Sequence, residues 1–296
     1  MSVNTGETTE SVVRDTQGEL TELMAQMRPR LHRYCARMVG SAFDGEDVVQ
    51  DALARAAVAY DDGVEHPERW LMRIAHNAAL DALRRKRRAA SRHAEAEMET
   101  IADAASAADA RVAAEASLAA FLALPPLQRS MVILGDVLGH PLTEMTEILG
   151  VTDAAGKAAL HRGRAALKQH AADVAPVVPF SAAERARLRA YADRFNARDF
   201  DALRALLAED VRLDLANRTR LVGREVGLYF THYGENPDWH VRPCLAEGRP
   251  ALVISDPKAA GDYVVLLEWR AGLIAVIHDY RFAPYLAETL KLEPLD

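Results

Sequence analysis

The sequence predicts a multidomain protein in which two all-α helical domains are followed by an α+β domain. The chain has 296 residues, more than one ordinary domain holds. As far as about residue 170, apolar residues recur at three- and four-residue steps, the period of a helix. From Ser181 the pattern changes, because a few helical segments give way to alternating apolar runs that predict a curved antiparallel sheet.

Composition narrows the class of protein. Hydrophobic residues make up 50% of the chain and charged residues 27%, so it can build packed cores and is neither disordered nor fibrous. The two cysteines, Cys35 and Cys244, lie far apart, which favours a reducing compartment and excludes a cysteine-based metal site. No apolar run reaches about 18 residues, and the N-terminus lacks a signal-peptide pattern. We therefore expect a cytoplasmic protein without membrane association, metal or cofactor.

Changes in composition and helix-breaking residues divide the chain into segments. The expected segments are a disordered N-terminus at 1–17, a first helical domain at 18–92, an Ala- and acid-rich linker at 93–117, a second helical domain at 118–171, a Pro-containing connector at 172–180 and the α+β domain at 181–296.

The first helical domain ends in a concentrated basic cluster. Its expected helices cover about 19–38, about 44–59 and the residues after Pro67, which suits a first helical position. The third helix runs into Arg84-Arg85-Lys86-Arg87-Arg88. Such a cluster can neutralise phosphates, but it also suits a solvated helix end, where the dipole favours cations. The cluster alone leaves both interpretations open.

The motifs of this domain resemble a known family. They are the acidic run from Asp44 to Asp51, the run from Trp70 to Asn77, then Asp81 and the Arg84-Arg85 pair. In order and spacing they are similar to region 2 of extracytoplasmic-function sigma factors, bacterial subunits that direct RNA polymerase to promoters.

That resemblance implies two binding surfaces on neighbouring helices. The polar face formed by Asp47, Gln50 and Asp51 would bind core RNA polymerase, and an acidic-polar face suits a basic partner. On the third helix, Asn77 would help to read a flipped base of the −10 element, since an amide supplies both a donor and an acceptor. The backbone of the opened strand would be held by Arg73, Arg84 and Arg85.

The second helical domain resembles region 4 of the same family, which binds the −35 element through a helix-turn-helix. The resemblance lies in the runs 124–129, 136–151 and 157–164, with a glycine turn at Gly150. It implies that promoter phosphates and the major groove are contacted by Lys157, His161, Arg162 and Arg164.

Region 4 also departs from the family pattern. Thr146 stands where the family usually has Ala, and Gly156 stands where it has a β-branched apolar residue. Glycine inside a helix costs about 1 kcal/mol, and the missing side chain about 1.5–3 kcal/mol of burial. Ala158 and Ala159 replace residues that often read bases. We expect a helix-turn-helix that folds but binds DNA weakly, or one that has become mainly a protein-contact module.

The C-terminal domain resembles the SnoaL-like branch of the NTF2-like fold, an α+β cone. The resemblance covers about 181–285 and rests on element order, on the run 191–196 with Asp199, and on the run 222–224. It implies a domain that contacts the sigma core and modulates it. The candidate residues for a small-ligand pocket are Asp214, Tyr229, Trp239, Trp269 and His278. Strand alternation places His278 and Asp279 on opposite faces, so they form no catalytic dyad, and no residue is identified as catalytic.

Taken together, these features predict an alternative sigma factor with a fused regulatory domain and no enzymatic activity. Its expected partners are core RNA polymerase, promoter DNA and, within the chain, the C-terminal domain. One alternative is a sigma-like adaptor or regulator without its own promoter selection. Another is a SnoaL-type cyclase or isomerase whose helical domains only localise it.

Overall fold

The computed structural model describes residues 6–61, 63–90, 113, 116–170, 180–216, 219–234, 238–255, 261–290 and 292–295, with side chains from residue 18 onward except at 89, 90 and 232. Most of the expected linker and connector lies outside these residues. The chain forms two compact units, Met1–Val174 and Ala175–Asp296.

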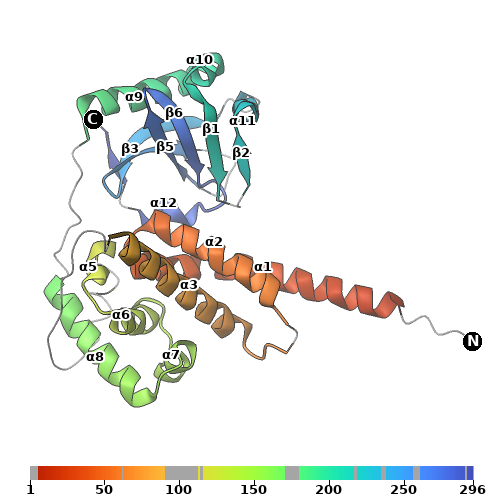
Figure 1. The fold of residues 1–296 in the computed structure, drawn as a ribbon, viewed down its shortest axis with the longest axis vertical. Coiled ribbons are helices and arrows are strands. Elements are labelled where there is room, and N and C mark those ends of the chain that lie inside the picture. Colours follow the sequence, from red (N-terminus) through yellow and green to blue (C-terminus); the bar gives the residue numbers. More distant parts are fainter. Residues whose placement is uncertain are drawn as a thin grey trace, which may run out of the picture. The chain divides into compact units, whose positions relative to one another are not determined.

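Unit 1 begins with three long helices (Figure 1): α1 (Gly6–Val39), α2 (Ala42–Ala59) and α3 (Pro67–Ala90). Helix α1 starts earlier than the expected residue 19, so the backbone from Gly6 onward is helical, not disordered. The Ser41 side chain caps α2 by accepting from the Asp44 amide. Helices α1 and α2 approach closely at Gly45, where a Cβ atom would lie 2.6 Å from the Ala36 Cα atom.

The second half of unit 1 contains α5 (Leu118–Leu122), α6 (Pro126–Val132), the π-helical segment η1 (Ile133–Val137), α7 (Leu142–Leu149) and α8 (Asp153–His170). Helix α7 ends at Gly150, whose φ of 66° is left-handed and suits glycine. Helix α7, the Gly150 turn and α8 form the expected helix-turn-helix.

Both sets of helices share one hydrophobic core. Tyr34 of α1, Leu71 of α3, Phe121 of α5 and Met131 of α6 are buried in the same cluster. The two expected helical domains therefore pack as one compact unit.

Unit 2 is an α+β domain, as the sequence predicts. Its helices are α9 (Ala182–Asn196), α10 (Phe200–Arg204), α11 (Arg224–Gly234) and α12 (Tyr285–Thr289), and its strands are β1 (Leu207–Leu215), β2 (Arg220–Val222), β3 (His240–Ala246), β4 (Arg249–Ser255), β5 (Tyr263–Arg270), β6 (Leu273–Asp279) and β7 (Leu292–Pro294). A capping box opens α9, with Ser181 and Glu184 as its partners.

The sheet is mixed, so the expectation of an antiparallel sheet is wrong at one pair. The strand order is β2-β1-β6-β5-β4-β3-β7, and β1 runs parallel to β6. A parallel pair needs a long connection, and the chain between these strands supplies it as α11 and four further strands of the same sheet. Helices α9 and α11 pack their apolar sides on the sheet, with Phe195 and Phe230 in the core.

None of the helices in the described part of the chain combines the length and hydropathy needed to cross a bilayer.

Candidate nucleic-acid and protein interface

Helix α3 carries an exposed polar stripe along one side. Arg73, Asn77 and Arg84 are all exposed, and their spacing places them on one face of the helix. The opposite face is buried through Leu71, Met72, Ala75 and Ala79. This apolar face fixes the helix in the core, so the amide and the cations face outward.

Arginines and aspartates of α2 and α3 form a network of ion pairs at the basic end of α3. The Arg55 guanidinium lies 3.1 Å from Asp81 Oδ2 and 3.5 Å from Asp51 Oδ2. Arg84 lies 3.3 Å from Asp81, and Arg85 lies 3.8 Å from Asp51. The hydrogen bond from Arg55 is the main cause of the lowered pKa of Asp81. Because these pairs are largely exposed, each is weak and can exchange for a phosphate or another partner.

The acidic face of α2 borders an open groove. Asp47 is exposed, whereas Gln50 is half-buried and donates to Glu46 at 3.4 Å. The groove has a volume of about 320 Å³ and lies between α2 and the second half of α3; its lining consists of Val39, Asp44, Asp47, Val48, Asp51, Ala82, Leu83, Arg85 and Lys86. The expected polymerase-binding acids and the expected DNA-binding Arg85 therefore line one groove.

Glu46 is a residue that the sequence reasoning missed. Its carboxylate is fully buried and lies 2.5 Å from the Arg28 guanidinium of α1. A buried carboxylate needs such a partner, so this ion pair fixes α2 on α1 and orients the acidic face of α2. The repeated acids of the motif gave no signal to separate Glu46 from its exposed neighbours.

Helix α8 presents only part of the expected cationic set. Lys157 and Arg162 are exposed, and His161 is half-buried. Arg164 instead makes two hydrogen bonds to Asp136, from Nε at 2.8 Å and from Nη2 at 2.6 Å. The Asp136 side chain is only 3% exposed, so Arg164 joins α8 to η1 in place of facing outward.

Thr146 and Gly156, the two departures from the family pattern, contact each other. A Cβ atom on Gly156 would lie 2.6 Å from Thr146 Cγ2, so the threonine methyl fills the space that a larger residue at 156 would use. The Thr146 hydroxyl donates to Asp153 Oδ1 at 2.8 Å. The expected loss of burial at Gly156 is therefore wrong, because no space is left empty.

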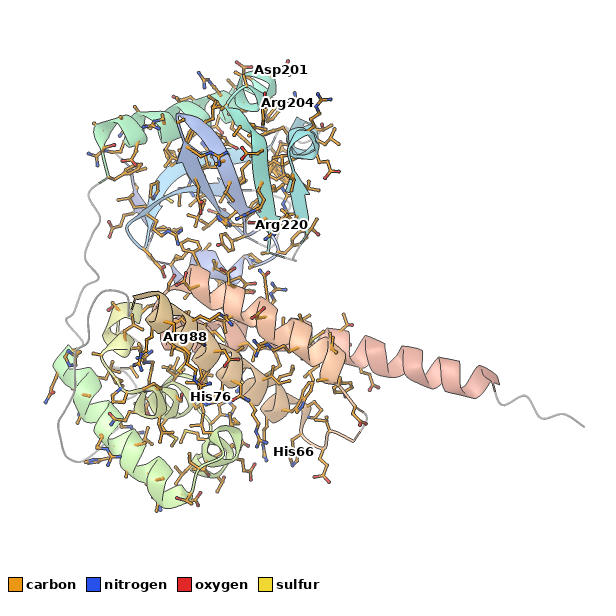
Figure 2. All side chains as sticks on the ribbon, viewed as in Figure 1. His66, His76, Arg88, Asp201, Arg204 and Arg220 are labelled. Carbon is orange, nitrogen blue, oxygen red and sulfur yellow. The ribbon has the colours of Figure 1, made fainter. Side chains whose placement is uncertain are left out.

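The residues expected to line a pocket in unit 2 do not come together. Asp214 of β1 lies beside His278 of β6, with Asp214 Oδ2 and His278 Nδ1 3.8 Å apart. Asp214 also accepts from Arg212 and from Arg220 at 2.7 Å each, and Figure 2 shows Arg220 on the edge strand β2. This charged ladder lies on one face of the sheet.

The other face of the sheet carries a buried polar cluster that includes Tyr229 and Trp239. The Asp279 carboxylate accepts from Tyr229 at 2.6 Å, from Tyr233 at 3.3 Å and from Arg281 Nε at 3.1 Å. The Arg281 guanidinium lies 5.9 Å from the Trp239 ring centroid. Burial, together with the charge of Asp279, raises the pKa of Tyr229 and Tyr233 well above the usual value.

His278 and Asp279 therefore lie on opposite faces, as strand alternation predicts. Trp269 packs against the same hydrophobic core as Tyr229 and Trp239, and its ring centroid lies 5.9 Å from the Arg187 guanidinium of α9. Alternation identified the faces, but nothing local in the sequence showed that Asp279, Tyr233 and Arg281 would meet. Among the described residues, no group of acids, histidines or cysteines is arranged to hold a metal ion.

The α3 stripe, the acidic face of α2 and the helix-turn-helix of unit 1 define a transcription factor with two sigma-type helical regions. The family model for Sigma-70 region 2 matches residues 23–89, and the model for Sigma-70, region 4 matches residues 115–167. The first match contains the stripe of α3 and the acidic face of α2, and the second contains the helix-turn-helix.

Similar proteins give the particular family. The chain is 31% identical over 156 residues to RNA polymerase sigma factor CarQ of Myxococcus xanthus, covering 52% of this chain and 89% of the relative. It is 32% identical over 151 residues to ECF RNA polymerase sigma factor SigM of Mycobacterium tuberculosis, covering 49% of this chain and 74% of the relative. The chain therefore belongs to the extracytoplasmic-function (ECF) family of RNA polymerase sigma factors, which direct transcription initiation.

Two solved structures are similar to larger or later parts of the chain. The ECF sigma factor SigJ of Mycobacterium tuberculosis aligns with a TM-score of 0.36 and 20% identity, covering 88% of this chain and 95% of its own. A putative ketosteroid isomerase from Kribbella flavida aligns with a TM-score of 0.27 and 31% identity, covering 32% of this chain and 75% of its own. The α+β class of unit 2 rests on its own helices and strand order.

Proposed function

We propose that α3 holds the unpaired promoter strand while α2 docks on core RNA polymerase. The observation that supports this most directly is the exposed stripe of Arg73, Asn77 and Arg84 on a helix whose other face is fixed in the core. Arg73, Arg84 and Arg85 would contact phosphates, which positions the strand without reading it. Asn77 would contact a base edge and contribute specificity.

The polymerase contact would lie on the acidic side of α2. Asp47 is exposed there and lines the groove together with Asp51, and the half-buried Gln50 lies next to Asp51 on the same helix. A partner with a cationic surface would gain from these acids mainly in association rate and orientation. The buried pair of Glu46 with Arg28 supports this role because it holds the face in place.

Region 4 would make a small contribution to promoter affinity through Lys157, His161 and Arg162. Arg164 is engaged with Asp136, so it supports the fold of α8 and is not counted among the phosphate contacts. The second candidate is a sigma-like adaptor or regulator without its own promoter selection, and the small basic set on α8 is what favours it.

Unit 2 would modulate the sigma core without catalysing a reaction. Its buried Asp279 is already bonded by Tyr229, Tyr233 and Arg281, an arrangement that stabilises the domain. A small ligand would have to be held by Tyr229 and Trp239 on one face, or by Asp214 and His278 on the other, since these pairs lie apart. Because its partner is RNA polymerase, the expected site of action is the cytoplasm.

Run-off transcription with core RNA polymerase and the full-length chain tests this function. Arg73→Ala and Asn77→Ala should each lower promoter-specific transcript, whereas Arg224→Ala, a matched exposed arginine of unit 2, should leave it unchanged. A promoter altered at −35 should lose little activity if region 4 binds weakly. No promoter-specific transcript from the unaltered chain would remove the proposal and favour the adaptor.

A further inference from the structure

Helix α7 of the helix-turn-helix is bound to the N-terminal half of α3. Arg69 of α3 lies between two acids of α7, with Nη1 2.8 Å from Glu147 Oε2 and Nη2 3.1 Å from Glu144 Oε1. One turn further along α3, Arg73 donates to the backbone carbonyl of Glu147, near the C-terminus of α7. The arginine expected to hold the promoter strand is therefore engaged within the chain.

A second set of contacts holds the turn before α7. His140 Nδ1 donates to Glu144 Oε2 at 2.9 Å, so its Nε2 accepts from Arg30 of α1 at 3.2 Å. The hydrogen bond from His140 and, less strongly, the charge of Arg69 lower the pKa of Glu144. Glu144 thus stays ionised and links α7 to both α1 and α3.

Buried polar contacts also hold the region 4 helices against the region 2 helices. Tyr34 of α1 lies 2.8 Å from His76 Nδ1 of α3 and donates to Ser130 of α6 at 3.0 Å. The buried Arg129 of α6 donates to the Met38 carbonyl of α1. Polar groups in a core must be paired, so these bonds fix the region 4 helices on the region 2 helices in one register.

The groups that α7 offers to α3 share the chemistry of a nucleic-acid backbone. Two carboxylates along α7 and a carbonyl near its negative C-terminal end lie against two arginines, where phosphates would otherwise bind. Helix α7 packs against α3 at Arg69 and Arg73, so a phosphate that approaches these two arginines competes with its carboxylates and carbonyl for their N–H groups. Binding of the strand at both arginines therefore favours separation of α7 from α3.

We propose that α7 competes with the promoter strand for Arg69 and Arg73. In the free chain, α7 occupies both arginines. The proposal rests on the strand-binding role given above to α3. Promoter binding is then coupled to separation of region 4 from region 2, and a partner that holds region 4 away from α3 raises the affinity of α3 for DNA.

The test uses the full-length variant Glu144→Gln/Glu147→Gln, which removes both carboxylates and leaves α3 intact. Hydrogen exchange of the α7 amides should become faster. Affinity for a fluorescein-labelled oligodeoxythymidine, measured by fluorescence anisotropy, should also rise. The rise should be about tenfold if the fraction of molecules in which α7 has left α3 increases from about a tenth to nearly all. The matched control is Glu19→Gln/Glu22→Gln, which removes the same charge from exposed acids of α1.

Three results would overturn the proposal. Unchanged α7 exchange would show that these acids do not hold the helix, and faster exchange without tighter DNA binding would show that α7 does not compete. An equal gain in the control variant would assign the effect to net charge. Adding Arg73→Ala to the open variant separates the two claims, because unchanged affinity there removes the strand-binding role itself, whatever α7 does.

Discussion

Thr146 and Gly156 share one packing site between α7 and α8, since a Cβ atom on residue 156 would lie 2.6 Å from Thr146 Cγ2. Each residue departs from the family pattern, but together they conserve the volume between the helices. Threonine stands where the family resemblance leads us to expect alanine, and glycine stands where it leads us to expect a larger residue. The pair accounts for a glycine inside a helix that would otherwise be a weak point.

This relationship predicts a strong coupling between the two positions. Gly156→Val alone should destabilise the chain by about 1–3 kcal/mol, because the new side chain overlaps the Thr146 methyl. Thr146→Ala alone should also destabilise it, through the emptied space and the lost bond to Asp153. The double variant should recover most of the Gly156→Val loss, measured by urea unfolding followed by far-UV circular dichroism. Additive losses would show that the residues do not share a site.

The buried histidines predict acid sensitivity of unit 1. Burial lowers the pKa of His76 to about 4, against an ordinary value of 6.5, and also lowers that of His32. The unfolded chain therefore binds these protons first, so stability should fall as pH drops from about 6.5 towards 4, by about 1.4 kcal/mol per pH unit for His76.

His76→Asn keeps a polar group beside Tyr34 and removes the titration. Figure 2 shows His76 among the helices of unit 1, whereas His66 lies before α3 and is exposed. The urea midpoints of wild type and His66→Gln should decrease between pH 7 and pH 5 more than that of His76→Asn. Equal decreases in all three would exclude His76 as the source.

Two aspartates on opposite faces of the unit 2 sheet should respond differently to the same change. Asp279→Asn breaks the pair between a fully buried carboxylate and the largely buried Arg281, and should cost about 3–5 kcal/mol. Asp214→Asn alters a partly exposed ladder and should cost about 1 kcal/mol or less. Thermal unfolding read by the fluorescence of Trp239 and Trp269 compares them. A larger loss at Asp214 would contradict the assignment of Asp279 to the stabilising cluster.

The cationic residues of α8 should differ in role, some contacting DNA and one stabilising the fold. Lys157→Ala and Arg162→Ala should each reduce the salt dependence of promoter binding by about one unit of slope, as loss of one phosphate contact does. Arg164→Ala should leave that slope unchanged and lower stability, because its guanidinium is bonded to Asp136. Salt titrations of DNA binding measure the first effect and urea unfolding the second. A reduced slope in Arg164→Ala would assign it to DNA.

The sequence predicted local structure well and long-range partners poorly. Periodicity located α2 and α3 and the main strands of unit 2, because helix and strand periods show directly in the spacing of apolar residues. Alternation also placed His278 and Asp279 on opposite faces. The bonds of Arg164 to Asp136 and of Arg69 to α7 were not predictable, since they join segments whose approach depends on packing of the whole unit.

The same limit explains why the sequence did not predict the parallel strand pair of the sheet. A run of alternating residues shows a strand but not its neighbour, so the parallel β1–β6 pair was not apparent. At residues 146 and 156 the sequence predicted a loss of burial that does not occur. Only the contact of the two residues in space shows that they compensate for each other.

The parallel pairing of β1 with β6 also sets an order of events during synthesis. Among the described strands, β1 pairs otherwise only with the short edge strand β2, so its long hydrogen-bonded neighbour β6 is not made until Leu273–Asp279 have been translated. The helices of the first unit can complete their core while the ribosome is still working on the second. Each newly made molecule can therefore complete the core of its sigma helices before β6 is available to complete the sheet of the second unit.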